Sequence, residues 1–299
     1  MKWLSSKLDI KLKQYIQTCN QVSDWAVRLR FKKNLNFVIV KYMKRLRLIP
    51  YSDYSAAFNM AADEYILSRP GTTLRYYGWS HPTLSFGRNN KKLDEIDLDV
   101  CKANQIELVS RLTGGKTVLH QHEITYSICS DIDLFSSSIL KTYRMISQPL
   151  AESLNRFGAN TEISPKQLSK RETSICFQEV SAYEIAVGGK KIVGSAQYRK
   201  TDRFLQHGSI LIDLNWDLWK KVWKVPLESK VLERRITTVN QESTEPFDQE
   251  QFEYQFAEQL AAVLGMEYYL EDFESEEINR ITKLMKKYEW SGNGCRGKY

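Results

Sequence analysis

Apolar residues recur at helical spacing in the last third of the chain. Phe252, Phe256, Leu260 and Leu264 lie four residues apart, which places them on one face of a helix. Ser55 can cap another helix that ends before Pro70-Gly71, and Gly158 is a suitable helix stop. Together these patterns predict further helices over residues 55–68, 93–104, 139–157 and 276–287. We expect the C-terminal part, about residues 247–290, to be helical.

Short apolar or alternating runs predict strands between these helices. Turns between neighbouring strands are indicated by the composition of three segments: Trp79–Pro82, Gly188-Gly189 and residues 200–202. The strands themselves are predicted over residues 74–77, 83–86, 106–110, 117–120, 123–130, 183–187, 191–198 and 204–212. Strands in neighbouring hairpins, with helices grouped between and after them, indicate an α+β fold rather than β-α-β alternation.

Composition is that of a globular protein, with 42% hydrophobic and 26% charged residues. No apolar run approaches the roughly 18 residues needed to span a bilayer. The five cysteines, Cys19, Cys101, Cys129, Cys176 and Cys295, are odd in number, scattered and without a Cys-x-x-Cys pair. We therefore expect neither a disulfide framework nor a zinc site, and we expect a reducing, cytoplasmic setting.

Positive charge is concentrated at the start of the chain. Residues 1–48 hold 12 Lys or Arg and 2 Asp or Glu, while the whole chain has 43 and 36, so the remainder is net negative. A basic segment can contact nucleic acid, a membrane or an acidic partner, but an idle extension fits the same pattern. We expect residues 1–42 to be an extension outside the fold, residues 43–299 to form the main domain, and no nucleic-acid partner.

Candidate chemistry centres on a cysteine and a lysine. Lys191 lies in the run Gly-Gly-Lys-Lys-Ile-Val-Gly-Ser-Ala-Gln over residues 188–197, and Cys176 precedes it by fifteen positions. A nearby ammonium lowers a thiol pKa and makes a thiolate nucleophile available. Neighbouring residues on a strand face opposite sides, so only one of Lys190 and Lys191 can face a site. A lone cysteine is more often a core residue, so the pair alone decides nothing.

Glycines and histidines supply weaker signals. Gly115-Lys-Thr resembles the end of a phosphate-binding loop, but that motif needs a glycine where the chain has Ser110. The Gly114-Gly115 turn can still present backbone N–H groups to an acyl oxygen or a phosphate. His120 and His122 would share one face of a strand, yet a third metal ligand is missing, so no metal site is expected. His207 is either a strand histidine or part of a site.

Four ordered motifs resemble the lipoate/biotin protein ligase-like superfamily. They are Arg75-Tyr-Tyr-Gly-Trp-Ser with Ser85-Phe-Gly-Arg, Arg111-Leu-Thr-Gly-Gly-Lys-Thr-Val-Leu-His, Gly189-Lys-Lys-Ile-Val-Gly-Ser-Ala-Gln, and Leu205-Gln-His-Gly-Ser-Ile-Leu. The resemblance runs from about Arg45 to the C-terminus. It implies an α+β fold with a mixed, largely antiparallel sheet flanked by helices.

Within that superfamily, Cys176-Phe followed by Tyr183-Glu is similar to the cysteine-dependent octanoyltransferases. The resemblance implies Cys176 and Lys191 as catalytic residues and no metal. It implies that the substrate is bound by Arg111, Gly114, Gly115, His120, Gly194, Ser195, Ala196, His207 and Gly208. Ser110 and Leu112 depart from the family pattern around Arg111, because one of its paired arginines is absent.

The implied activity is transfer of an octanoyl, or a lipoyl, group from acyl carrier protein to a lysine of a lipoyl domain. The acceptor would be glycine cleavage H protein or a dehydrogenase E2 domain, and no cofactor would be required. Leu119 and Val193 are expected to line a tunnel for the acyl tail. Two alternatives stay open: an ATP- and Mg-dependent lipoate–protein ligase, and a non-catalytic module that binds acyl carriers.

Overall fold

The computed structural model describes residues 45–89, 93–164, 184–224 and 233–290. The predicted extension 1–42 lies outside these residues, as do Met43 and Cys176, and the predictions for them stay predictions. None of the helices in the described ranges is long and apolar enough to cross a membrane.

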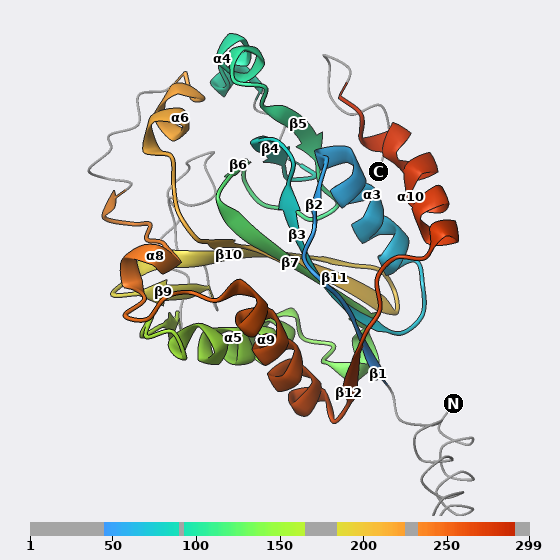
Figure 1. Ribbon diagram of the computed structural model, residues 1–299. Helices are drawn as coiled ribbons and strands as arrows, with labels where there is room; N and C mark the ends of the chain where they lie inside the picture. The colour runs from blue at the N-terminus through green and yellow to red at the C-terminus, as the bar shows by residue number, and fades with distance from the viewer. Residues whose placement is uncertain (1–44, 90–92, 165–183, 225–232, 291–299) are drawn as a thin grey trace, which may run out of the picture. The chain divides into compact units, whose positions relative to one another are not determined.

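A nine-stranded sheet forms the centre of the fold (Figure 1). Its order is β12 (Glu267–Leu270), β1 (Arg45–Ile49), β3 (Thr72–Trp79), β7 (Glu123–Asp131), β11 (Arg203–Leu211), β10 (Lys190–Arg199), β9 (Ile185–Val187) and β8 (Glu162–Ile163), with β2 (Asp53–Tyr54) also pairing with β3. The pairs β12–β1, β1–β3 and β2–β3 are parallel, and all pairs from β3 to β8 are antiparallel. The prediction of a mixed, largely antiparallel sheet is confirmed.

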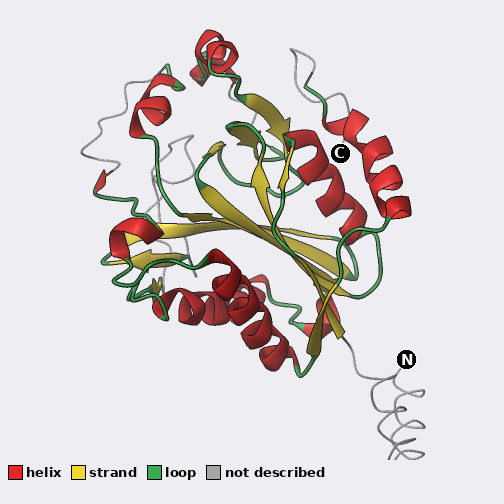
Figure 2. Ribbon diagram, in the orientation of Figure 1, coloured by secondary structure: helices red, strands yellow, loops and turns green. Residues whose placement is uncertain are grey.

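Helices cover both faces of this sheet (Figure 2). On one face lie α5 (Ile139–Asn155) and α9 (Gln249–Leu264), and on the other lie α3 (Ala56–Leu67) and α10 (Ser275–Tyr288). The predicted helices over 55–68, 139–157 and 276–287 match α3, α5 and α10 to within a few residues. Gly158, three residues after α5, has the left-handed backbone expected of a helix stop.

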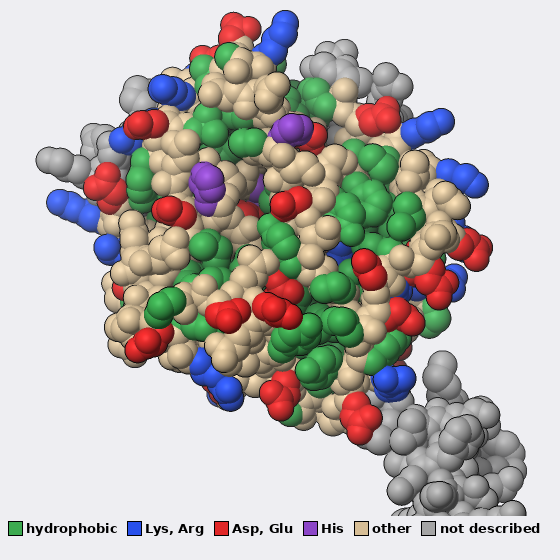
Figure 3. Space-filling view, in the orientation of Figure 1, with side chains coloured by type: hydrophobic (Ala, Val, Ile, Leu, Met, Phe, Trp, Pro, Cys, Tyr) green, Lys and Arg blue, Asp and Glu red, His purple; other side chains and the backbone are tan. Residues whose placement is uncertain are grey.

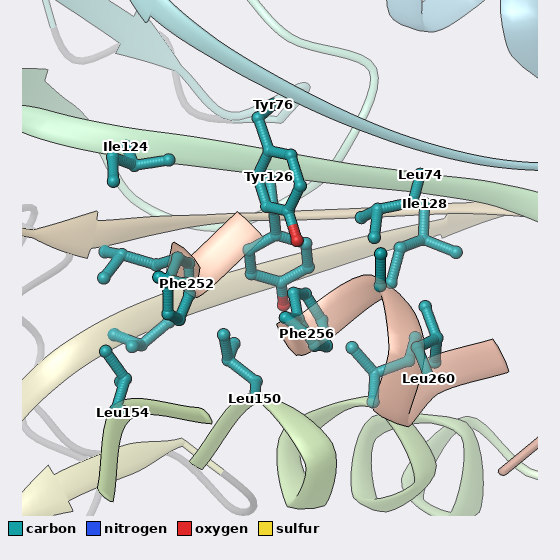
Figure 4. Packing of buried hydrophobic residues seen from close by; sticks show 14 of the residues in the cluster. Leu74, Tyr76, Ile124, Tyr126, Ile128, Leu150, Leu154, Phe252, Phe256 and Leu260 are labelled. Atoms are coloured by element: carbon teal, nitrogen blue, oxygen red, sulfur yellow. The ribbon is translucent and has the colours of Figure 1, made fainter. Parts of the chain in front are cut away.

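The core beneath α5 and α9 explains the four-residue repeat in the sequence. Phe252, Phe256 and Leu260 are completely buried there, and Leu264 at the end of α9 is partly buried. Tyr76 of β3 and Tyr126 of β7 meet Phe256 edge to face, with ring centroids 6.3 and 5.7 Å away (Figure 4). The helical stripe is therefore confirmed, and its partners are aromatic residues on the central strands.

A smaller sheet stands apart from the main one. Its middle strand β4 (Thr83–Phe86) pairs with β5 (Glu107–Ser110) in parallel and with β6 (Val118–His120) in antiparallel orientation. It shares a hydrophobic core with α4 (Leu98–Ala103) and α6 (Trp216–Lys221).

Two of the hairpins expected from the sequence do not form, because β4 and β6 belong to the small sheet. We expected residues 74–77 and 83–86 to pair, but β3 and β4 belong to different sheets. The reason is that β1 and β7 already pair with β3 on its two sides. Likewise β7 lies between β3 and β11, so β6 cannot pair with it. By contrast, the two hairpins that join β9, β10 and β11 are confirmed, and Gly188 and Gly189 have positive φ angles of 54° and 75°.

The single helix expected over residues 93–104 is wrong. A short 3-10 turn, η1 (Leu93–Glu95), comes first, and Ile96 then forms a bridge with Trp223. Asp97 is the N-cap of a separate helix, α4, because its carboxylate accepts from the backbone N–H groups of Asp99 and Val100.

The sequence pattern did not predict β1, β2, β8, β12, α6, α8 (Val239–Glu242) or the short 3-10 helix η2 (Ile132–Leu134).

We predict that Phe256→Ala lowers the free energy of unfolding by about 3–5 kcal/mol, because it leaves a cavity among rings that cannot close in. Urea denaturation followed by circular dichroism measures the change. Tyr254→Ala on the same helix is the control, since that side chain is 37% exposed and should change the value by about 0.5 kcal/mol or less. Equal losses for the two variants would contradict the assignment of this core.

Candidate active site

A pocket lies where the main sheet, the small sheet and α3 meet. It holds about 420 Å³ of empty space, its open mouth included. Its walls come from all three parts of the fold: Met60, Tyr77, Trp79, Ser85, Arg111, Val118, His120, Thr125, Gly194, Ser195, Ala196, His207, Gly208 and Ser209. Seven of the nine residues predicted to bind substrate are among them, all but Gly114 and Gly115. The fold therefore brings these residues together, and their role in binding stays a prediction.

Pairing of two strands places the small residues of the pocket wall. Gly194, Ser195 and Ala196 of β10 lie opposite Ser209, Gly208 and His207 of β11. A Cβ atom on Gly208 would lie 2.6 Å from Ser195 Oγ and 2.6 Å from Tyr126 Cε1. Glycine at this position therefore lets β10, β11 and the Tyr126 ring approach one another.

The apolar lining differs from the expected one. We expected Leu119 and Val193 to line a tunnel, but both are packed in hydrophobic cores away from the pocket. Their chain neighbours Val118 and Gly194 line it instead. Side chains alternate between the two sides of a strand, so an error of one position moved the prediction to the wrong face.

A buried carboxylate anchors one end of a hydrogen-bond chain along the pocket wall. Asp63 of α3 is 2% exposed, and its Oδ2 lies 3.1 Å from His207 Nδ1 and 3.2 Å from the Tyr77 hydroxyl. Arg75 lies 3.4 Å from the other carboxylate oxygen. The His207 ring then reaches Thr113 Oγ1 through Nε2 at 2.7 Å. The sequence reasoning missed Asp63, because a single acidic residue within a predicted helix gave no signal.

The chain continues through Arg111 to a second histidine. Arg111 Nε donates to Thr113 Oγ1 at 3.2 Å, and its Nη1 donates to Ser85 Oγ at 2.9 Å. Ser85 Oγ lies 2.7 Å from His120 Nε2, and His120 Nδ1 lies 2.8 Å from Glu123 Oε1. Seven side chains, from Asp63 to Glu123, thus form one continuous chain across the two sheets.

Donor and acceptor capacity fixes the direction of these bonds. A guanidinium can only donate, so the Thr113 and Ser85 hydroxyls accept from Arg111 and direct their own protons to the two Nε2 atoms. His207 and His120 then carry their protons on Nδ1, each facing a carboxylate. Burial lowers the pKa of His207, and the hydrogen bond and charge of Asp63 oppose this shift only in part. The His207 ring in the pocket wall is therefore neutral at neutral pH.

The Gly114-Gly115 turn sits beside the pocket without lining it. Arg111 Nη2 donates to the carbonyls of Gly114 and Lys116 at 3.1 and 2.6 Å, which ties the turn to the hydrogen-bond chain. Gly115 has a φ of +100°. Beneath the turn, a Cβ on Gly87 would lie 2.0 Å from the Gly115 carbonyl oxygen. Gly87 is thus a further residue that the site requires, and the sequence reasoning gave it no role.

The two spaced histidines do not share a strand face. β6 ends at His120, and His122 is exposed with a φ of +46°. The Trp79 ring stacks on His120, with centroids 4.1 Å apart. Both residues line the pocket and also an open cleft that His81 and His122 line. Figure 3 shows histidine side chains at the surface of the molecule. Within the described residues, no three His, Cys, Asp or Glu side chains are placed to hold a metal ion.

Lys191 is buried on the strand that forms the pocket wall. Its side chain is 1% exposed, and its Nζ lies 2.6 Å from Glu184 Oε1. Lys190 is partly exposed, in keeping with opposite faces for the two lysines. Lys191 precedes the lining residue Gly194 by three positions and does not itself line the pocket.

Two of the five cysteines lie in the described part of the chain. Cys101 and Cys129 are buried, and burial raises the pKa of Cys101 to about 11 and that of Cys129 well above its usual value. Neither thiol ionises readily at neutral pH. Both are therefore poor nucleophiles.

Residues 55–261 match the lipoyl protein ligase A/B catalytic domain family. The chain belongs to this family. It is 36% identical over 265 residues to octanoyltransferase LipM of Carboxydothermus hydrogenoformans, covering 86% of this chain and 97% of that protein. It is 34% identical over 263 residues to octanoyltransferase LipM of Clostridioides difficile, covering 83% of this chain and 97% of that one.

Solved structures share the fold at lower identity. A lipoate-protein ligase A bound with ATP has a TM-score of 0.69 and 22% identity, covering 82% of this chain and 95% of that one. A bipartite lipoate protein ligase from Thermoplasma acidophilum, studied with its E2 lipoyl domain, has a TM-score of 0.68 and 20% identity, covering 82% and 93%. The fold implied by the sequence resemblance is confirmed.

We predict that Gly87→Ala lowers the free energy of unfolding by about 1–3 kcal/mol, because the new methyl group overlaps the backbone of the Gly114-Gly115 turn. Chemical denaturation measures the loss. Gly114→Ala is the matched control, since a Cβ there meets nothing within 4 Å and its φ is not positive. A Gly87→Ala variant as stable as Gly114→Ala would contradict the close packing of the turn.

We predict a pH dependence of stability from His207. Its folded-state pKa lies below the usual value near 6.5, so below that pH the unfolded chain binds the proton more readily than the folded one. The free energy of unfolding should therefore fall as pH drops from about 7.5 to 5, and should fall less steeply in His207→Gln. The exposed His81 supplies the control variant, His81→Gln, which should keep the wild-type slope. If the free energy of unfolding of His207→Gln falls with pH as steeply as that of the wild type, His207 is not the source of this pH dependence.

Proposed function

We propose that this protein is an octanoyltransferase that moves an octanoyl group from acyl carrier protein to a lysine of a lipoyl domain. The observation that carries the proposal is the match to octanoyltransferases over 97% of their length at 34–36% identity. The match extends over nearly the whole length of those proteins and is not confined to one shared segment. The motif with Cys176 supports the same branch of the family.

The chemistry of the pocket supports an uncharged acyl chain as its occupant. Met60, Tyr77, Trp79 and Val118 give it apolar walls, and no Asp or Glu is among the described residues that line it. The guanidinium of Arg111 in this lining donates to hydroxyls and to a backbone carbonyl of the protein. Each methylene removed from water contributes about 0.8 kcal/mol to binding. The neutral His207 ring places no charge beside the tail. A straight eight-carbon acyl group would therefore bind through its hydrocarbon part.

The proposed reaction has two acyl-transfer steps. The Cys176 thiolate attacks the carbonyl carbon of the carrier thioester, the bond to the carrier sulfur breaks, and the carrier leaves as a thiol after taking up a proton. The neutral amine of the acceptor lysine then attacks the Cys176 thioester. The products are an amide and the free Cys176 thiol. Amide formation from a thioester is downhill, so the proposal requires no ATP, metal or other cofactor.

The described residues give the remaining parts of the proposal. The Lys191 ammonium would stabilise negative charge on the sulfur and on the carbonyl oxygen. Backbone groups at Gly114-Gly115 and at Ser195-Ala196 would lie beside that carbonyl. The acceptor would be a lipoyl domain of glycine cleavage H protein or of a dehydrogenase E2 component. The scattered cysteines support a reducing, cytoplasmic setting.

Intact-mass spectrometry tests the proposal directly. The protein is mixed with octanoyl-acyl carrier protein without ATP, and we predict a gain of one octanoyl group that disappears when a lipoyl domain is added. Cys176→Ala should abolish both the adduct and transfer, at an unchanged circular dichroism spectrum. Cys101→Ala is the control and should retain both, because that thiol is buried with a raised pKa.

Other outcomes would replace the proposal. Transfer of free lipoate or octanoate only with ATP and magnesium would identify an ATP-dependent ligase. Binding of the carrier with neither an adduct nor a transferred group would identify a non-catalytic module. Near wild-type transfer by Cys176→Ala would contradict the covalent intermediate.

A further inference from the structure

The ion pair between Lys191 and Glu184 is the most completely buried lysine–carboxylate contact in the described part of the chain. The two side chains are 1% and 4% exposed, and their charged atoms lie 2.6 Å apart. The Lys287–Glu64 pair, by comparison, is 24% and 23% exposed. A buried ammonium keeps its proton only when a nearby negative charge offsets the loss of water. Glu184 therefore favours the charged form of Lys191.

Backbone contacts fix both partners of this pair. The Lys191 N–H donates to the carbonyl of Arg235 at 2.7 Å, and the Lys191 carbonyl accepts from the N–H of Thr237 at 3.0 Å. On its other side, Lys191 lies opposite Ala186 of β9. The Glu184 carbonyl accepts from the N–H of Ser164 at 3.0 Å. Because the backbones of Lys191 and Glu184 are both held by hydrogen bonds, the Glu184 carboxylate restricts the positions that the Lys191 ammonium can occupy.

Glu184 also lies within electrostatic reach of the pocket wall. Burial is the main cause that raises the pKa of Tyr126, hydrogen bonds from Ser195 and Gln206 oppose it, and the charge of Glu184 raises it further. The Tyr126 hydroxyl is 2.8 Å from Ser195 Oγ, and Ser195 lines the pocket. The Lys191–Glu184 pair is therefore connected to the pocket through Tyr126 of β7 and Ser195 of β10.

We propose that Glu184 is a positioning residue that holds the Lys191 side chain in place and keeps it charged for acyl transfer. The inference rests on the proposed function, in which the Lys191 ammonium stabilises the thiolate and the oxyanion. Glu184 is not among the residues that line the pocket, so it acts through Lys191. The carboxylate makes Lys191 an electrostatic stabiliser at neutral pH rather than a base that starts without its proton.

The inference is tested by measuring acyl transfer by the full-length protein and by three variants: Glu184→Gln, Glu184→Asp and the control Glu276→Gln. The control removes a carboxylate from an exposed pair with Arg280 on α10. Glu184→Gln should lower kcat by about tenfold or more with little change in KM, because an electrostatic stabiliser has lost its support. Glu184→Asp should restore part of kcat, and Glu276→Gln should match the wild type.

The pH profile distinguishes positioning from simple destabilisation. Without the carboxylate, the buried Lys191 ammonium loses its proton at a lower pH, so the alkaline limb of kcat should move to lower pH in Glu184→Gln and return towards wild type in Glu184→Asp. Tyr126 on β7 is a second titratable group on which the charge of Glu184 acts, and Tyr126→Phe should leave that limb unchanged. A uniform loss of rate with the wild-type pH profile would overturn the inference.

A measurement independent of activity tests the pair itself. In thermal unfolding, Lys191→Met and Glu184→Gln should each lower Tm, and the double variant should lose less than the sum, because neither charge is then left alone. Additive losses would overturn the inference. Should Glu184→Gln not fold, Glu184→Asp decides: wild-type kcat and pH profile there would also overturn it. Failure of the wild type to transfer octanoyl would instead refute the proposed function, while a coupled Tm cycle would still stand.

Discussion

The buried chain of hydrogen bonds from Asp63 to Glu123 is the constraint on which the site depends. It joins α3, the main sheet and the small sheet through side chains that are all nearly inaccessible to water. In a buried polar network each hydrogen bond depends on its neighbours, so a change at one position alters the partners of the next. The main sheet and the small sheet share no strand pairing in the described part of the protein, and these hydrogen bonds connect them at the pocket.

Arg111 is the centre of that constraint. Its guanidinium reaches two hydroxyls and the carbonyls of Ser85, Gly114 and Lys116. A lysine could not replace it, because one ammonium cannot donate in so many fixed directions. The motif that runs from Arg111 to His120 therefore reads as one structural unit: the arginine orders the glycine turn, and the turn approaches the sheet only because Gly87 has no side chain.

Local patterns were enough to predict α3, α5, α9 and α10 and the two hairpins that join β9, β10 and β11, because contacts within these elements span few residues. The four-residue repeat from Phe252 located α9, and Gly188-Gly189 located the turn before Lys191. Pairings between distant segments left no local signal. β1 and β12 were missed for that reason, and β4 was given the wrong partner because competition for the edges of β3 cannot be seen in the sequence. Within the site, ordered motifs predicted seven lining residues. The roles of Asp63 and Gly87 could be recognised only from the structure, because they depend on contacts with residues distant in the sequence.

The parallel pairing of β1 with β12 has a consequence for how the protein is made. Arg45 of β1 lies opposite Glu267 of β12, more than 200 residues later in the chain. At about 5–20 residues per second, the ribosome adds β12 roughly ten to forty seconds after β1. During this interval β1 can join β3 but presents an open strand edge, which is a template for pairing with other chains. Arg45 and Arg47 on that edge place like charges there, so the nascent strand repels copies of itself until its own C-terminal segment arrives.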